Sequence, residues 1–293
     1  MNKHWDRTTE PKSAPSDFSI ITPSFNMLHW LRKASASIAD QEGVSVQRII
    51  IDGGSNDGTR DWLAQQQGII SLSEKDDGMY DAINKGLKLS TGSIVAYLNC
   101  DEQYLPNALA FVKDSFDKHP NTDIIFGDFL VVDYKGALIA YRKAFAPRRV
   151  YIKWDHLYLF TCTMFLRRRV VEDGFLFDSR LRDVGDSDFV LRLLKNGYKA
   201  RHLKRYLSVF SMTGDNRFIK LDALKEKSAQ DPHLRFFSPV KRVVRVARLS
   251  EKLFHGAYVQ RFPLSYQIYA DNDLTSRTEF EFSRGTFIWH LPK

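Results

Sequence analysis

The chain has 293 residues and a formal net charge of +8, with 43% hydrophobic and 27% charged residues. This is the composition of an ordinary soluble globular protein, and the 12 Tyr and 21 Phe exclude an intrinsically disordered chain because they supply ample surface to bury. The length allows one large domain or two modest ones. The two cysteines, Cys100 and Cys162, are too few for a disulfide framework, which suits a reducing compartment.

The first segment, residues 1–16, is polar and contains two prolines. It lacks the apolar stretch of a signal peptide, so we expect a flexible leader. No apolar run reaches the roughly 18 residues that a membrane-spanning helix needs, and the longest, residues 157–166, is closed by three arginines. We therefore expect a cytoplasmic protein, and any contact with a membrane would be peripheral, at the inner face.

Residues 18–133 predict strands alternating with helices. Short apolar runs indicate the strands, and apolar residues at helical spacing indicate the helices. The predicted strands are residues 18–22, 46–51, 69–72, 94–98 and 123–133, and the helices are residues 27–40, a short helix after Thr59, residues 80–89 and residues 106–118. This order implies βαβ units and an α/β fold with a mostly parallel sheet covered on both faces.

Polar residues stand where these predicted strands end. Ser24, Asp52, Asp76 and Asp101 each lie just beyond the carboxyl end of a strand. In parallel α/β sheets, ligands bind beyond the carboxyl ends of the strands. We therefore expect these four side chains to converge on one rim of the sheet.

The alternation weakens after about residue 135. The expected elements are extended stretches at 138–145 and 161–167, a helix at 186–196, strands at 198–203 and 207–212, a basic amphipathic helix at 240–254, and a hairpin within 278–290 around Arg284 and Gly285. We place one domain over residues 17–215 and a helical and hairpin extension over residues 216–293.

Residues 99–102, Asn-Cys-Asp-Glu, follow a buried strand. Carboxylates in such a place need solvent, a partner or a metal ion. One carboxylate together with substrate phosphate oxygens is a usual Mg²⁺ arrangement, which makes Asp101 a candidate ligand. The alternative is a solvated turn that leads into the next helix.

Two further polar segments begin helices. Residues 52–59, Asp-Gly-Gly-Ser-Asn-Asp-Gly-Thr, hold three glycines that let a ligand approach the backbone, although this segment taken alone favours a plain strand-to-helix turn. The segment is not a G-x-x-x-x-G-K-[ST] phosphate loop. In residues 76–86, Lys85 has the placement to meet a phosphate or to pair with Asp81 one helical turn earlier.

Residues 185–189, Gly-Asp-Ser-Asp-Phe, begin another helix. Asp186 has the place of an ordinary N-cap. Its alternative role is a general base that accepts a hydroxyl proton. Three nearby arginines would keep these carboxylates ionised if they lie close: Arg180, Arg182 and Arg192.

Taken together and in order, these segments resemble the family 2 glycosyltransferases of the GT-A fold. The matching segments are residues 20–26, 51–59, 74–86, 99–102 and 185–193. The resemblance covers about residues 17–215. Each segment alone is a weak signal, and their common order makes the resemblance specific.

The resemblance implies a role for each matching position. The strand end at Thr22, Pro23 and Ser24 would line the nucleotide, and Asp52, followed by Gly53, would bind the uracil or another base. Asp76 would sit beside the nucleoside. The remaining implied sites are Asn84 and Lys85 near the sugar and diphosphate, Asn99 in the metal motif, Asp101 as the ligand of Mg²⁺ or Mn²⁺, Asp186 as the base and Asp188 as the alternative base.

The sequence departs from the family pattern in two places. The metal motif usually reads Asp-x-Asp, and here its first position is Asn99. The residue before the base is Gly185, where many members have an acid. The implied reaction is transfer of a sugar from a nucleotide-sugar donor, most simply UDP-linked, to an acceptor hydroxyl with inversion, as in bacterial-type surface polysaccharide or glycolipid synthesis.

Two other functions stay open from the sequence. One is a degenerate relative that binds a nucleotide sugar without turnover, which Asn99 keeps open and the retained Asp101 and Asp186 disfavour. The other is a nucleotidyltransferase. That class carries a Gly-rich basic loop after its first strand, where this chain has Pro-Ser-Phe-Asn. Contacts to the acceptor, a glycan or a lipid-linked molecule, are expected from residues 154–169.

The basic helix predicted at Val240 to Phe254 has the charge and spacing of a helix that lies on an anionic membrane surface. The alternative is a helix that packs on the catalytic domain with a solvated basic face. A sequence pI near 9.3 also fits a nucleic-acid partner. No RRM-like or helix-turn-helix pattern appears, so we expect no nucleic acid.

Overall fold

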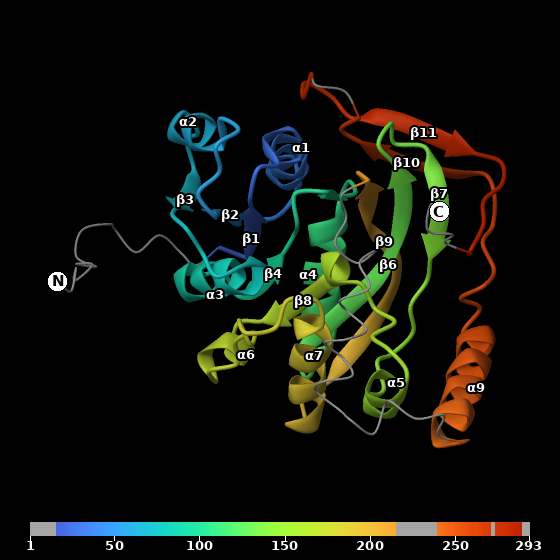
Figure 1. Ribbon diagram of the computed structural model, residues 1–293. Coiled ribbons are helices and arrows are strands. Elements are labelled where there is room, and N and C mark those ends of the chain that lie inside the picture. The colour runs from blue at the N-terminus through green and yellow to red at the C-terminus, as the bar shows by residue number, and fades with distance from the viewer. Residues whose placement is uncertain (1–15, 215–238, 271–272, 289–293) are drawn as a thin grey trace.

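The computed structural model describes residues 16–214, 239–270 and 273–288. Within them the strands form a nine-stranded mixed sheet and a separate two-stranded one, with helices on both sides of the large sheet (Figure 1). The predicted α/β class is confirmed. The predicted leader lies almost wholly outside the described residues, as does the predicted domain boundary at 215 and 216.

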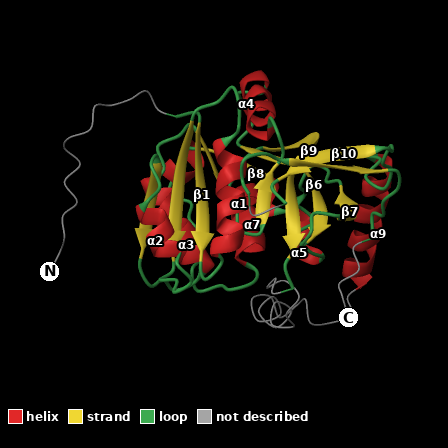
Figure 2. Ribbon diagram, turned by 90° about the horizontal axis from the view of Figure 1, so that it is seen from above, coloured by secondary structure: helices red, strands yellow, loops and turns green. Residues whose placement is uncertain are grey.

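The first half of the chain builds a parallel sheet with the strand order β3-β2-β1-β4. The strands are β1 (Phe18–Ser24), β2 (Val46–Asp52), β3 (Ile69–Ser73) and β4 (Ile94–Tyr97), and the helices are α1 (Leu28–Ala39), α2 (Thr59–Ala64) and α3 (Met79–Leu89). The apolar run of β1 is buried because helices cover both faces of the sheet. In Figure 2 the arrowhead of β1 points to the loops at one edge of the sheet.

The second half extends the same sheet with both parallel and antiparallel pairs, in the order β8-β6-β9-β5 after β4. β7 pairs with β6 off this path. The elements are β5 (Glu102–Tyr104), α4 (Ala108–Lys118), β6 (Ile124–Asp133), β7 (Leu138–Arg142), α5 (Arg149–Trp154), a 3-10 turn η1 (Thr161–Thr163), β8 (Met164–Arg167), α6 (Arg169–Glu172), α7 (Gly185–Lys195), β9 (Ala200–Met212) and α9 (Pro239–Phe254).

Three predictions in this half need correction. The two strands expected at 198–203 and 207–212 are one continuous strand, β9, whose polar middle lies beside irregularities in β6, where the register shifts on both sides of Asp128. The segment at 99–102 is not only a turn, because Glu102 begins the short buried strand β5. The helix expected from Pro106 begins at Ala108, after the left-handed Asn107.

The predicted hairpin is wrong in its position. β11 (Thr278–Phe282) pairs back with β10 (Leu264–Ile268), so the connection is the long segment 269–277 and not a turn at Arg284 and Gly285. Residues 289 and 290 of that prediction lie outside the described residues. The alternating face of β10 carries Tyr266 and Ile268 into a cluster with Leu130 and Val209 of the large sheet, which fixes the hairpin on it.

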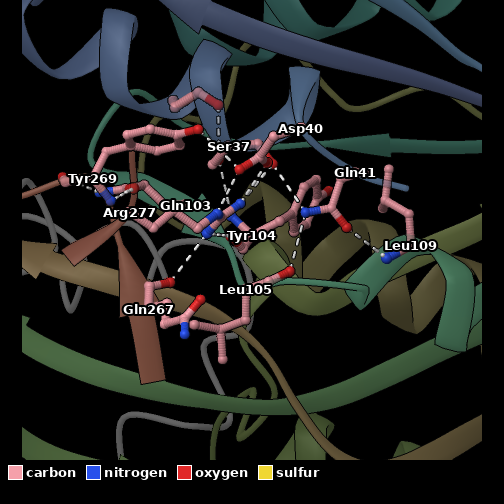
Figure 3. A network of polar contacts seen from close by, with 11 residues as sticks. Ser37, Asp40, Gln41, Gln103, Tyr104, Leu105, Leu109, Gln267, Tyr269 and Arg277 are labelled. Carbon is pink, nitrogen blue, oxygen red and sulfur yellow. Dashed lines mark hydrogen bonds and ion pairs between the residues drawn. The ribbon is translucent and has the colours of Figure 1, made fainter. Parts of the chain in front are cut away.

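A polar network joins the end of α1 to the hairpin (Figure 3). The guanidinium of Arg277 donates from Nε and Nη2 to the two carboxylate oxygens of Asp40 at 2.6 Å each. It also donates to the carbonyls of Tyr104 and Gln267, at 2.8 and 3.1 Å. A planar guanidinium forms this fork and an ammonium does not, so Arg277 ties three segments that are remote in sequence.

We expect Arg277→Lys to lower the free energy of unfolding by about 1–2 kcal/mol, because lysine keeps the charge and loses the fork. Arg284→Lys, at an exposed position of the same segment, is the matched control and should leave stability unchanged. Thermal unfolding of both variants tests this. Equal midpoints for the two would show that the network contributes nothing.

Candidate active site

A cleft of about 1520 Å³ opens at the carboxyl ends of the parallel strands. One wall comes from the loops after β1, β2, β3 and β4, and the other comes from residues 155–161, the start of α7 and Lys241 of α9. The predicted site residues that line it are Pro23, Ser24, Gly53, Asp76, Asn99, Asp101 and Asp186. The expected convergence of strand ends on one rim is therefore observed for most of these positions.

Five predicted site residues do not line this cleft: Thr22, Asp52, Asn84, Lys85 and Asp188. Thr22 is buried within β1. Asp52 is fully buried, and its carboxylate accepts hydrogen bonds from the hydroxyls of Ser55 and Ser73, the latter at 2.6 Å. These hydrogen bonds of the Asp52 carboxylate stabilise the turn after β2.

The other three side chains also have partners within the protein. Asn84 bonds the backbone of Phe177 twice, donating to its carbonyl at 2.8 Å and accepting from its N–H at 2.9 Å. Lys85 pairs with Glu74 and Asp81, the second of which was the predicted alternative. Asp188 pairs with Arg192 one turn along α7 at 2.7 Å.

A buried carboxyl orients the amide of Asn99. Glu102 is 1% exposed and accepts from the Asn99 backbone N–H at 2.8 Å and from its Nδ2 at 3.2 Å. Burial, reinforced by the charge of Asp101, raises the pKa of Glu102 well above its usual range. Because Nδ2 is committed to Glu102, the other end of the amide, Oδ1, is left to face elsewhere.

Two cleft residues carry buried oxygens that no described residue satisfies. They are Ser24 Oγ and Asn99 Oδ1. A buried polar atom without a partner is costly, and in native structures it calls for an explanation such as a water, an ion or a ligand. The two oxygens follow the ends of β1 and β4, so both atoms that need a partner lie on the same rim of the sheet.

Gly53 lies against the carboxylate of Asp76. A Cβ at position 53 would lie 2.7 Å from Asp76 Oδ2, so the Asp76 side chain would have to shift. Asp76 Oδ1 in turn accepts from the N–H of Gly78 at 2.9 Å. The glycine in the Asp-Gly-Gly turn therefore leaves room for a carboxylate that lines the cleft.

Asp186 lies at the first turn of α7, where two tyrosines contact it. The Tyr97 hydroxyl donates to Oδ1 at 2.6 Å, and the Asp186 N–H donates to the Tyr80 hydroxyl at 3.3 Å. Burial raises the pKa of Asp186 to about 6, while the tyrosine hydrogen bonds act in the opposite direction by stabilising the charged form. A carboxyl with a pKa near working pH suits proton transfer.

The absence of an acid at position 185 has a steric cause. A Cβ on Gly185 would lie 2.5 Å from Cε2 of Tyr80. Tyr80 stacks on Phe177 with ring centroids 5.3 Å apart, and Phe177 stacks on Phe189 of α7 at 4.1 Å. The aromatic ring therefore occupies the space that a side chain at 185 would need.

Sequence reasoning missed Glu102, Tyr97 and Tyr80. In the sequence Glu102 is simply part of a polar turn, and the two tyrosines lie in stretches whose pattern is that of the core. The available signal was position: Tyr97 ends a buried strand two residues before Asn99, and Tyr80 begins the helix after Asp76. Asp155 and His156 also line the cleft, and both lie in the segment 154–169 from which acceptor contacts are expected. Arg182, one of the three arginines expected near Asp186, lines it as well, whereas Lys75 lines it without having been predicted.

The strand ends of the sheet hold an Asn-x-Asp pair, and the half-buried Asp186 lies on the opposite wall of the same cleft. The family model "Glycosyl transferase family 2" matches residues 19–175, more than half of the chain. The chain belongs to glycosyl transferase family 2.

A relative in Mycobacterium tuberculosis (strain H37Rv), "PGL/p-HBAD biosynthesis glycosyltransferase Rv2957", is 30% identical over 185 residues. That match covers 61% of this chain and 70% of the relative. An uncharacterized glycosyltransferase of Nostoc is 28% identical over 126 residues, 39% of each chain.

Solved structures share the fold at low identity. TarS of S. aureus, residues 1–349 in complex with UDP-GlcNAc, has a TM-score of 0.60 and 16% identity, covering 81% of this chain and 73% of that one. This chain spans 43% of the longer TarS chain. The mannosyltransferase PcManGT of Pyrobaculum calidifontis, in complex with GDP-Man and Mn²⁺, has a TM-score of 0.53 and 17% identity, covering 82% and 72%.

We expect Asn84→Asp to lower the free energy of unfolding by about 2 kcal/mol, because a carboxylate cannot donate to the Phe177 carbonyl. Asn121→Asp, at an exposed position, is the matched control and should change little. Chemical denaturation measures both. If Asn84 contacts the donor instead, the variant will keep its stability and lose nucleotide binding.

Proposed function

We propose that the protein is a metal-dependent, inverting glycosyltransferase that uses a UDP-sugar. The observation that carries the proposal is that Asp101 and Asp186 line one cleft, the first on the strand-end rim and the second at the start of α7. The raised pKa of Asp186 suits a base, and the orphaned oxygens on the rim suit a polar ligand.

The residues present fit a divalent cation that also binds the substrate. Among the described residues no group of three or more His, Cys, Asp or Glu side chains could hold a metal alone. Mg²⁺ commonly takes one or two protein carboxylates and completes its shell with phosphate oxygens and water. In this proposal Asp101 would hold Mg²⁺ or Mn²⁺ by its carboxylate, with a neutral amide oxygen from Asn99, and the ion would supply positive charge for the departing diphosphate.

Asp186 is the proposed base. The acceptor hydroxyl oxygen forms a bond to the sugar C1, the bond from C1 to the diphosphate oxygen breaks, and the hydroxyl proton passes to the Asp186 carboxylate. Attack on the face opposite the leaving group inverts the anomeric centre. Because a hydroxyl is a far weaker acid than a carboxyl, the proton transfers late, as the new bond forms. Tyr97 holds the carboxylate by its 2.6 Å hydrogen bond.

The fold relatives support a nucleotide-sugar donor, with UDP-GlcNAc bound to TarS and GDP-Man bound to PcManGT. We choose UDP for this chain as the simplest donor consistent with the family resemblance. The acceptor we propose is a glycan or a lipid-linked molecule, in surface polysaccharide or glycolipid synthesis at the inner face of a membrane. The mycobacterial relative named for PGL/p-HBAD biosynthesis supports that direction.

No helix in the described part of the chain is long and apolar enough to cross a bilayer. Retention of both acidic positions in one cleft favours turnover over a relative that only binds the donor.

Asp101→Ala should abolish the stabilisation that UDP gives in the presence of Mn²⁺. A ligand that binds the native state raises the free energy of unfolding by about 2.7 kcal/mol at a hundred times Kd, and the unfolding midpoint rises with it. Thermal shift with UDP, GDP, CMP and dTDP, each with and without Mn²⁺, measures this. Asp117→Ala on the exposed face of α4 is the control. A shift with GDP alone would indicate a GDP-sugar donor in place of a UDP-sugar. No shift with any nucleotide would count against the proposal.

Asp186→Asn should lower release of UDP from UDP-sugars by about 10²–10⁴-fold while nucleotide binding stays intact. Asp188→Asn is the matched control, since its carboxylate pairs with Arg192. If the control loses turnover and Asp186→Asn keeps it, the base is Asp188.

The pH profile gives a second test of the base. Asp186 must be ionised to accept a proton, so kcat/KM should fall as the pH drops through about 6. Tyr97→Phe removes a donor that stabilises the carboxylate, so the pKa of Asp186 rises and the acidic limb moves to higher pH. An acidic limb that stays in place in Tyr97→Phe would remove Tyr97 from this role.

A further inference from the structure

Helix α9 docks with its charged side inward. Arg248 and Lys252 are each only 5% exposed. Arg248 Nε donates to Asp155 Oδ2 at 2.7 Å, and Lys252 Nζ lies 4.2 Å from the centroid of the Phe287 ring. This orientation is the reverse of an ordinary surface helix, whose apolar stripe faces the core.

Glu251 strengthens the same inner contact. Its carboxylate accepts from Arg148 Nε at 2.7 Å and from the Tyr151 hydroxyl at 2.7 Å, at the first turn of α5. His255, just beyond the helix, stacks on Phe145 with centroids 5.8 Å apart. These contacts fix the rotation of α9 about its axis, so its outer face is set by the ion pairs beneath it.

The outer face of α9 is apolar. Figures 1 and 2 show the helix at the periphery of the molecule. Its exposed hydrophobic side chains are Val240 (47%), Val243 (67%), Val246 (59%), Leu249 (39%), Leu253 (62%) and Phe254 (88%). Helical spacing puts Val243, Val246, Leu253 and Phe254 on the side of the helix opposite Arg248 and Lys252, with Val240 and Leu249 at the two edges of that side.

Positive charge accompanies this apolar face. Arg242 and Arg245 are exposed on the same helix, and residues 239–250 contain no Asp or Glu. A helix with an apolar face and flanking basic residues lies in the plane of a bilayer interface and gains from anionic lipid headgroups. A second copy of the same face would bring arginines against arginines, so the charge pattern favours a lipid surface over self-association.

We propose that the outer face of α9 binds an anionic lipid bilayer and brings the cleft to that surface. Lys241, in the first turn of α9, lines the cleft beside Asp155 and His156. Asp155 also accepts a hydrogen bond from Arg248, so this contact joins the wall of the cleft to α9. The acceptor that this geometry favours is lipid-linked, with its polar head entering the cleft; this last step rests on the proposed glycosyltransferase activity.

The test is co-sedimentation of the full chain with phosphatidylcholine vesicles and with vesicles that also contain phosphatidylglycerol. Wild-type protein should bind the anionic vesicles and bind phosphatidylcholine weakly. Val246→Glu with Leu253→Glu should lose more than about tenfold in binding, because both side chains leave the apolar phase. Tyr134→Glu with Ile70→Glu, two exposed apolar positions outside α9, is the matched control and should bind as wild type.

A second pair of variants tests the charge. Arg242→Glu with Arg245→Glu should weaken binding to anionic vesicles by about tenfold or more, at about 1 kcal/mol per basic residue near the surface. Arg60→Glu with Lys88→Glu makes the same change in net charge at exposed positions elsewhere and should bind as wild type. If both double variants lose vesicle binding equally, net charge alone explains the loss, and the assignment of the binding surface to α9 is overturned.

Two further results would overturn the proposal. One is wild-type protein that binds no vesicles. The other is a wild-type dimer by light scattering that Val246→Glu with Leu253→Glu converts to a monomer, which would make the face a contact between copies. The thermal shift with UDP and Mn²⁺ is measured on the same variants. Because that shift reports the cleft alone, it separates failure of the membrane surface from failure of the proposed function.

Discussion

The parallel pairing of β2, β1 and β4 is the constraint on which the site depends. Their registers place Ser24 beside Asp52 and carry the end of β4 to the same edge of the sheet. Strands that run in one direction deliver their carboxyl ends to one side, so polar residues from remote parts of the sequence meet there. The antiparallel strand β8 beside β4 adds the second half of the sheet, and α7 of that half brings Asp186 to the opposite wall of the same cleft.

That edge is also where the fold keeps polar atoms unsatisfied. Most buried polar groups in native proteins have a partner, so the two orphaned oxygens of Ser24 and Asn99 need a cause. Glu102 explains part of this for Asn99. Because Glu102 accepts from Nδ2 of the amide, Oδ1 is the end without a partner. The stacked rings of Tyr80, Phe177 and Phe189 give α7 a rigid base, so Asp186 is held by packing as well as by hydrogen bonds.

The sequence predicts the rim well and the inner contacts poorly. Strand ends follow from apolar runs, which is why Ser24, Asp76 and Asp101 were located correctly on the cleft. Whether a polar side chain at such an end faces the cleft or the protein depends on its neighbours in three dimensions. Asp52 and Asn84 turn inward, to Ser73 and Phe177, and no local pattern reveals those partners. Tyr97 was missed for the opposite reason, because its ring is core and its hydroxyl alone belongs to the site.

The same distinction governs α9. Its sequence period correctly predicts an amphipathic basic helix, but periodicity describes two faces and does not say which one meets the body. The face that packs on the body is set by Asp155, Arg148 and the aromatic rings of residues 145–158 and 287. These groups bind the charged side chains of α9 and not its Val or Leu side chains. Burial, with Arg142 and Arg248 nearby, lowers the pKa of Lys252 to about 7, so the fold disfavours the charged form of this lysine and still keeps it inside. A helix held this way leaves its apolar face outward, and a large exposed apolar face on an otherwise ordinary surface is the mark of a binding surface.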